Sequence, residues 1–269
     1  ALAIQGRGTQ PALNLAEHPQ IPQNTAALVI AGPRFDLLPG EIKAIEDYLA
    51  AGGNLLWLGD PGPLYGLEPV AETLGIEFQP GVIVDPASEV ITGNATAIVV
   101  TRYSRHPTVL NFRNVTLFPS AAGIALKLPE GWQAKVLFGA RPEAWSETGA
   151  LGGRIALDRD TDVAGPLDLA IALTRHHGEN EQRVVIIGDG DFLSNRFLGN
   201  GINLELGMSI ANWLAQDDAY VNIPVRVGAD RTLELTPTTR VVIAGGLLFL
   251  MPLLLVGSGL LIWLRRRRR

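Results

Sequence analysis

Polar side chains cluster directly after two apolar runs, residues 54–58 and 183–187. They are Asp60, Asp189, Asp191, Ser194 and Asn195. Ligands of open α/β sheets bind beyond the carboxyl ends of the strands, and carboxylate oxygens suit hard cations. The pattern therefore predicts a site for a polar ligand or a hard cation. The alternative interpretation, which the Asp and Asn content of these loops favours, is that these side chains close turns by hydrogen bonding to nearby backbone groups.

The sequence offers little for covalent catalysis. An amidotransferase-type reaction needs a nucleophile on the turn after a strand, yet the chain has no cysteine and no G-x-S-x-G motif. His176 and His177 are adjacent in a polar loop, so their side chains diverge, and no phosphate-binding G-x-x-x-x-G-K-[ST] motif is present. We therefore predict a non-enzyme without a cofactor or bound metal. A metal-dependent hydrolase that uses Asp189 and Asp191 is the alternative.

The candidate loops follow elements that alternate between strand and helix. Residues 26–31 read as a buried strand, Pro39 begins a helix that ends at Gly52-Gly53, and residues 54–58 read as a second strand. This βαβ order predicts two parallel strands with a right-handed crossover. Further along, a polar hairpin-like loop precedes the strand at 183–187, and a helix is expected over residues 203–214.

The C-terminal end carries the longest apolar run. Residues 241–264 contain no charged side chain, and five arginines follow. About 24 helical residues span roughly 36 Å, enough for a hydrocarbon layer of about 30 Å, so the run predicts a transmembrane helix. Arginines are retained on the cytoplasmic side, which places the preceding domain outside the cytoplasm. The predicted interface anchors, which would contact membrane lipid, are Arg240, Trp263, Arg265, Arg266, Arg267, Arg268 and Arg269.

These features divide the 269 residues into five parts. A lead-in segment (1–25), continuing from a missing N-terminal part, precedes an extracytoplasmic α/β domain (26–235) that is less regular over 85–165. A linker (236–240), the transmembrane helix (241–264) and a cytoplasmic arginine cluster (265–269) follow. Without the terminal five arginines, 17 basic residues stand against 27 acidic ones, and this balance argues against nucleic acid as a partner.

Several motifs, in their order along the chain, resemble one family. They are the run VIAGPRFDLLPGEIKAIEDYLAAGGNLLWLGDPG, the Trp-Ser-Glu at 145–147, the strand and loop RVVIIGDGDFLSN, the helix NLELGMSIANWLA, and a proline-containing apolar helix before an arginine cluster. Together they resemble the auxiliary component of uncharacterised ABC-type transport systems, the group associated with gliding motility. The likeness extends over residues 26–269 and is strongest at both ends.

The resemblance implies a flavodoxin-like or glutamine-amidotransferase-like parallel sheet domain, followed by the single C-terminal transmembrane helix. It also implies an ABC permease and its ATPase as partners, at the bacterial inner membrane with the domain in the periplasm or outside. The resulting prediction is a non-enzymatic, membrane-anchored auxiliary subunit that acts in recognition or assembly. The alternatives are the membrane-tethered hydrolase and a scaffold subunit of another membrane complex.

Overall fold

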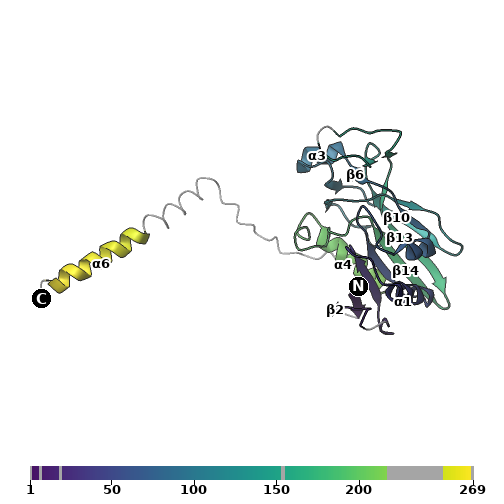
Figure 1. Ribbon diagram of the computed structural model, residues 1–269, viewed down its shortest axis with the longest axis horizontal. Helices are drawn as coiled ribbons and strands as arrows, with labels where there is room; N and C mark the ends of the chain where they lie inside the picture. The colour runs from purple at the N-terminus through teal and green to yellow at the C-terminus, as the bar shows by residue number, and fades with distance from the viewer. Residues whose placement is uncertain (1, 6–7, 18–19, 153–154, 217–250, 268–269) are drawn as a thin grey trace. The chain divides into compact units, whose positions relative to one another are not determined.

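The structure is a computed structural model that describes residues 2–5, 8–17, 20–152, 155–216 and 251–267. The chain forms two compact units, Ala1–Pro224 and Val225–Arg269 (Figure 1). The first unit holds the strands and helices that carry the candidate site, and the second holds one described helix, α6.

A seven-stranded sheet runs through the first unit in the order β10-β13-β14-β4-β3-β1-β2. In this order the strands are Gln133–Gly139, Asp168–His177, Asn180–Ile187, Leu55–Leu58, Ala27–Ala31, Leu2–Gln5 and Gly8–Ala12. Only β14 with β4 and β4 with β3 pair in parallel, and the other neighbours are antiparallel. The predicted lead-in segment thus contributes β1 and β2 to one edge of the sheet.

The predicted βαβ unit is confirmed. Helix α1, Pro39–Ala50, connects β3 to β4, which pair in parallel with Leu28 opposite Leu55. Glu41 lies in the first turn, and one of its carboxylate oxygens accepts a hydrogen bond of 2.8 Å from the backbone N–H of Leu38. That bond satisfies an N–H that the helix itself leaves unpaired, and the negative charge suits the positive end of the helix dipole.

Helices cover both faces of the central strands. Because strand side chains alternate between faces, Val29, Leu56 and Val185 pack in one hydrophobic cluster, whereas their neighbours pack in another. The first cluster includes the apolar side chains of α4, Asn203–Leu214. The second includes those of α1 and of α2, Glu68–Leu74, which ends at Gly75 in the left-handed conformation. The central strands are therefore buried on both faces. The loops that follow them all leave the sheet at one edge.

Smaller sheets surround this centre. They pair β12 (Val163–Ala164) with β11 (Trp145–Glu147) and β6 (Val82–Val84), β5 (Ile76–Phe78) with β9 (Ile124–Leu126), and β7 (Ile98–Val100) with β8 (Thr116–Phe118). A short helix, α3 (Pro86–Thr92), follows β6. They lie largely in the region predicted to be less regular.

The predicted flavodoxin-like or amidotransferase-like parallel sheet is wrong. The fold is mixed α/β, with several sheets and few helices in the part of the chain that the structure describes. The main departure is the hairpin of β13 and β14, which pair antiparallel from Ala170–Ile187 to His177–Asn180. An antiparallel strand buried on both faces reads as the same continuous apolar run as a parallel one, so the sequence pattern did not separate them.

The predicted transmembrane helix at 241–264 is also wrong. Its first part, residues 241–250, lies outside the described residues. Helix α6, Met251–Arg267, has 17 residues of which the last three are arginines. Within the described ranges, no helix combines the length and the apolar character needed to cross a membrane.

The predicted interface anchors fall in two groups. Trp263, Arg265, Arg266 and Arg267 lie on α6, where the Arg267 guanidinium stacks over the Trp263 ring at 5.2 Å. Arg240, Arg268 and Arg269 lie outside the described residues. The contacts with lipid and the placement of the domain outside the cytoplasm were inferred from the transmembrane helix, and they lose that support.

Candidate functional site

The carboxyl ends of three parallel strands meet at one edge of the sheet. β3 continues into Gly32-Pro33-Arg34, β4 into Gly59-Asp60-Pro61, and β14 into Gly188-Asp189-Gly190. The backbone N–H of Gly32 donates to the carbonyl of Leu58 at 2.9 Å, and that of Gly59 donates to Ile187 at 2.8 Å. The three loops therefore leave the sheet side by side.

Asp189 is a fully buried carboxyl group at this edge. One oxygen, Oδ1, accepts hydrogen bonds of 2.8 Å from the backbone N–H groups of Asp191 and Phe192. The other, Oδ2, accepts one of 3.0 Å from Ser120. The side chain thus closes the turn after β14 and ties it to the loop after β8.

Burial controls the ionisation of Asp189. It raises the pKa of this carboxyl from 3.8 to about 7, although the three backbone donors act in the opposite direction. The nearby charge of Asp60 contributes to this rise in the pKa. Asp189 is thus half protonated near neutral pH, with its oxygens turned to the protein's own amides.

Asp60 links the loop after β4 to the loop after β14. Its Oδ1 accepts a hydrogen bond of 2.8 Å from the backbone N–H of Gly190. A Cβ atom on Gly190 or Gly32 would lie 2.7 Å from Asp60 Oδ2, so only glycine leaves room for the carboxylate between the loops. Desolvation raises the pKa of Asp60, the charge of Asp191 raises it further, and Arg34 lowers it.

The remaining predicted residues lie further along the loop after β14. Asp191 is half-buried, and its carbonyl accepts the N–H of Ser194 at 2.8 Å. Ser194 accepts the N–H groups of Phe197 and Leu198 through its carbonyl, and Asn195 is exposed. The structure therefore brings Asp60, Asp189 and Asp191 together, while Ser194 and Asn195 belong to the following turns.

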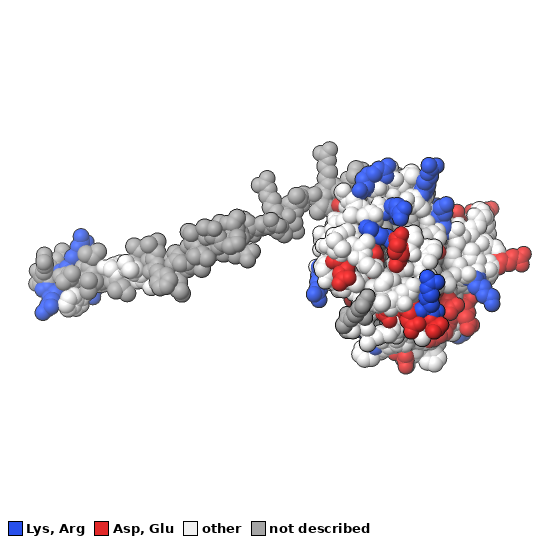
Figure 2. Space-filling view, turned by 90° about the horizontal axis from the view of Figure 1, so that it is seen from above, with Lys and Arg blue, Asp and Glu red and all other residues white. Residues whose placement is uncertain are grey.

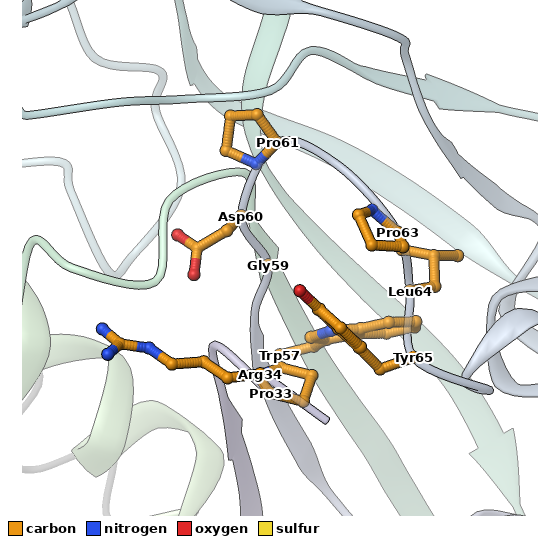
Figure 3. A pocket seen from close by; sticks show the side chains of 9 residues that line it. All are labelled: Pro33, Arg34, Trp57, Gly59, Asp60, Pro61, Pro63, Leu64 and Tyr65. Atoms are coloured by element: carbon orange, nitrogen blue, oxygen red, sulfur yellow. The ribbon is translucent and has the colours of Figure 1, made fainter. Parts of the chain in front are cut away.

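An open hollow lies beside Asp60 (Figure 3). It lies between the loops after β3 and β4, and its lining is Pro33, Arg34, Trp57, Gly59, Asp60, Pro61, Pro63, Leu64 and Tyr65. Sequence reasoning did not predict Arg34 or Tyr65 as site residues. The rule that pointed to Asp60 and Asp189, applied to the first strand at 26–31, would have pointed to Arg34 as well.

Tyr65 adopts an unusual backbone conformation at this hollow. Its φ angle is 55°, in the left-handed region that residues other than glycine rarely occupy. Its carbonyl accepts the N–H of Leu37 at 2.9 Å, which joins the two loops of the hollow. Outliers of this kind persist where the surrounding structure enforces them, and they are concentrated at functional sites.

No group of three or more His, Cys, Asp or Glu side chains with metal-binding geometry occurs among the described residues. Three backbone N–H groups donate hydrogen bonds to the Asp189 carboxylate, and a fourth donates to one oxygen of Asp60. The arrangement can join three loops into a rigid surface, and it leaves Arg34, Asp60 and Tyr65 facing the hollow (Figure 3).

Comparison with known proteins supports the resemblance seen in the sequence. A solved structure titled "mmIFT52 N-terminal domain" is similar with a TM-score of 0.52 and 16% identity, covering 72% of this chain and 78% of that one. At this identity the likeness concerns the fold alone. No curated protein matches the chain. The family model described as "ABC-type uncharacterized transport system" matches residues 10–222. Because that match covers most of the chain, the chain belongs to the auxiliary family of ABC-type transport systems.

Proposed function

We propose that the protein is a non-enzymatic auxiliary subunit of an ABC-type transport system that acts in recognition or assembly. Family membership links the chain to such a system and so to a membrane context. The permease and its ATPase are the proposed partners, and the ATPase would supply the hydrolysis of ATP. The proposed role of this chain is to present a rigid surface to them or to a ligand.

The hydrogen bonding of Asp189 carries this proposal. A catalytic base or metal ligand needs lone pairs directed at a substrate or a cation. In Asp189 both oxygens instead accept bonds from the backbone of adjoining loops, and the side chain is fully buried. Its geometry favours a structural role at the sheet edge, which is what a recognition surface requires.

The charge of the chain favours protein or small-molecule partners over nucleic acid. The sequence has 22 basic and 27 acidic residues. On the face shown in Figure 2, basic side chains lie scattered and acidic ones gather at one side of the first unit. Phosphate backbones bind to continuous basic surfaces, which this face does not present.

The proposal is tested by copurification. The tagged full chain is isolated in mild detergent from membranes of the native host, and its companions are identified by mass spectrometry. We expect a permease and an ATPase of one ABC system, in fixed ratio to the bait. Recovery of the chain alone, together with metal-dependent hydrolase activity, would contradict the proposal.

A matched variant separates assembly from catalysis. Asp191→Asn removes a half-buried carboxylate while retaining the backbone N–H that binds Asp189. We expect this variant to copurify with the same partners and to support transport at the wild-type rate. A transport defect with intact assembly would instead support the hydrolase.

A further inference from the structure

The hollow beside Asp60 holds two opposite charges that the described residues leave unneutralised. Arg34 is exposed and forms no ion pair within 4.0 Å with any described carboxylate. Asp60 Oδ1 accepts the Gly190 N–H, whereas Oδ2 accepts no hydrogen bond from any described residue. Figure 3 shows both side chains extending to the same side, with the Tyr65 hydroxyl pointing toward them. A cation and a carboxylate are thus held apart at one rim.

The rest of the lining is apolar and rigid. The lining includes the proline rings at positions 33, 61 and 63, the side chain of Leu64, the ring of Tyr65 and the buried Trp57. Prolines fix φ, and the hydrogen bond from Leu37 to Tyr65 fixes one loop on the other. Small-molecule sites are concave and largely apolar, with a few placed polar groups. The lining of the hollow has this composition.

Charge restricts what such a hollow accepts. The protein is acidic overall, with 27 acidic residues against 22 basic ones. An anion bound to Arg34 would also lie near the Asp60 carboxylate, which lines the same hollow. A ligand with several negative charges would be repelled, and a simple cation would be repelled by Arg34. A ligand that carries one charge of each sign satisfies both groups, and an apolar substituent suits the proline and tyrosine rings.

We propose that this hollow binds a small zwitterion of the α-amino-acid class, with its carboxylate on Arg34 and its ammonium group on Asp60. Guanidinium and carboxylate pair through two parallel hydrogen bonds, and an ammonium group donates to the free lone pairs of Asp60 Oδ2. The apolar side chain of the ligand packs against Tyr65 and the prolines. This inference goes beyond the proposed function, because it requires neither permease nor ATPase.

Calorimetric titration of the purified full chain tests the assignment. The probes are L-phenylalanine and L-leucine, N-acetyl-L-phenylalanine, which lacks the ammonium group, and phenylethylamine, which lacks the carboxylate. We expect at least one of the two amino acids to bind. The two derivatives should bind at least about tenfold more weakly, the factor that corresponds to one lost charged contact.

Variants assign the two charges. Arg34→Ala and Asp60→Asn should each weaken binding of the amino acid at least about tenfold. The asparagine side chain in the second variant retains an oxygen for the Gly190 N–H, and circular dichroism verifies that each variant is folded. Arg102→Ala and Asp160→Asn, at exposed positions outside the hollow, are the charge-matched controls and should bind as wild type.

Two results would overturn the assignment. One is that neither amino acid binds at millimolar concentration, and the other is that both site variants bind as tightly as the controls. Because the titration uses the isolated chain, its failure leaves the copurification result untouched. Copurification without amino-acid binding would therefore reject this inference and retain the transport role.

Discussion

Asp189 is held by three backbone N–H donors at a site from which water is excluded. Replacing it with alanine leaves the N–H groups of Ser120, Asp191 and Phe192 buried without acceptors, and a buried unpaired donor costs about 1–3 kcal/mol. We expect Asp189→Ala to lower the free energy of unfolding by about 3 kcal/mol or more, measured by urea denaturation.

The neighbouring carboxylate provides the control for that prediction. Asp191 is half-buried, and it is the backbone, not the side chain, of this residue that contacts Asp189. Asp191→Ala should therefore change the free energy of unfolding by less than about 1 kcal/mol. Equal losses in the two variants would show that the hydrogen bonds of Asp189 are not what stabilises the loop.

His106 is a half-buried titratable group of the first unit with a shifted pKa. Its ring lies edge-on to Trp213 at 4.8 Å, and Nδ1 is 2.9 Å from the hydroxyl of Thr108. Burial lowers the pKa of His106 from 6.5 to about 4, and the positive charges of Arg183 and Lys135 lower it further. We expect the ring resonances of His106 to titrate with a midpoint near pH 4 in an NMR experiment. A midpoint at about 6 or above would contradict the packing described here.

The candidate site was predictable at this scale only in part. Asp60, Asp189 and Asp191 were predicted together because each follows an apolar strand. The use of Asp189 to close a turn was the alternative interpretation, and its hydrogen bonds match that one. Arg34 was missed although it also follows an apolar strand. Tyr65 was missed because it is brought to the hollow by a left-handed backbone and a hydrogen bond from Leu37. No periodicity in the sequence encodes such a contact between loops.

Between elements, the contact of Asp60 with Gly190 joins the strand ends of β4 and β14. A Cβ on residue 190 would lie 2.7 and 2.9 Å from the two carboxylate oxygens of Asp60, so alanine there must displace the side chain. We expect Gly190→Ala to lower the free energy of unfolding by about 1–3 kcal/mol, the usual range for overpacking. Urea denaturation measures the loss.

A double-mutant cycle identifies the cause of that loss. In an Asp60→Ser background the carboxylate that collides with the new methyl group is absent, so Gly190→Ala should cost at least about 1 kcal/mol less than in the wild type. Additive losses would mean that the glycine is required for its backbone and not for its distance from Asp60.

Asn54 connects more elements than any residue the sequence analysis singled out. Its amide donates to the carbonyls of Ala26 at 3.0 Å and Leu214 at 2.8 Å, and its oxygen accepts the N–H of Arg183 at 2.8 Å. It therefore joins the starts of β3 and β4 and the middle of β14 to the end of α4. We expect Asn54→Ala to cost about 2–4 kcal/mol of unfolding free energy, whereas Asn114→Ala, at an exposed position, stays within about 0.5 kcal/mol. Chemical denaturation compares the two.

The elements themselves were largely readable from the sequence. α1, α4 and the β3–β4 pair were predicted because apolar spacing, Pro39 and the glycines at 52–53 are local signals. The antiparallel pairing of β13 with β14 agrees with the predicted hairpin-like loop. The pairing of β13 with β10 was not predicted, because it joins residues far apart in the sequence. The apolar run at 241–264 was over-interpreted. Its hydropathy predicted a membrane span, and the described helix α6 does not meet the requirements for one.

For the whole molecule, the shifted pKa values of Asp189 and His106 act on stability in opposite directions. The folded state raises the pKa of Asp189 from 3.8 to about 7, so it binds more protons than the unfolded state between these values, and stability falls as pH rises. The folded state lowers the pKa of His106 from 6.5 to about 4, so it binds fewer protons, and stability rises with pH. Between about pH 4 and 6.5 the two contributions offset each other.

Removing one group at a time exposes the other. Asp189→Asn removes the group that lowers stability as pH rises. The free energy of unfolding of this variant should therefore rise from about pH 4 to 6.5 more steeply than that of the wild type. In His106→Gln the upward contribution is gone, and the free energy of unfolding should fall, relative to the wild type, as pH rises over the same interval. Urea denaturation at about four pH values between roughly 4 and 8 measures both slopes. Three parallel profiles would mean that neither group has the shifted pKa assigned to it here, because only a difference in protons bound between folded and unfolded chains makes stability depend on pH.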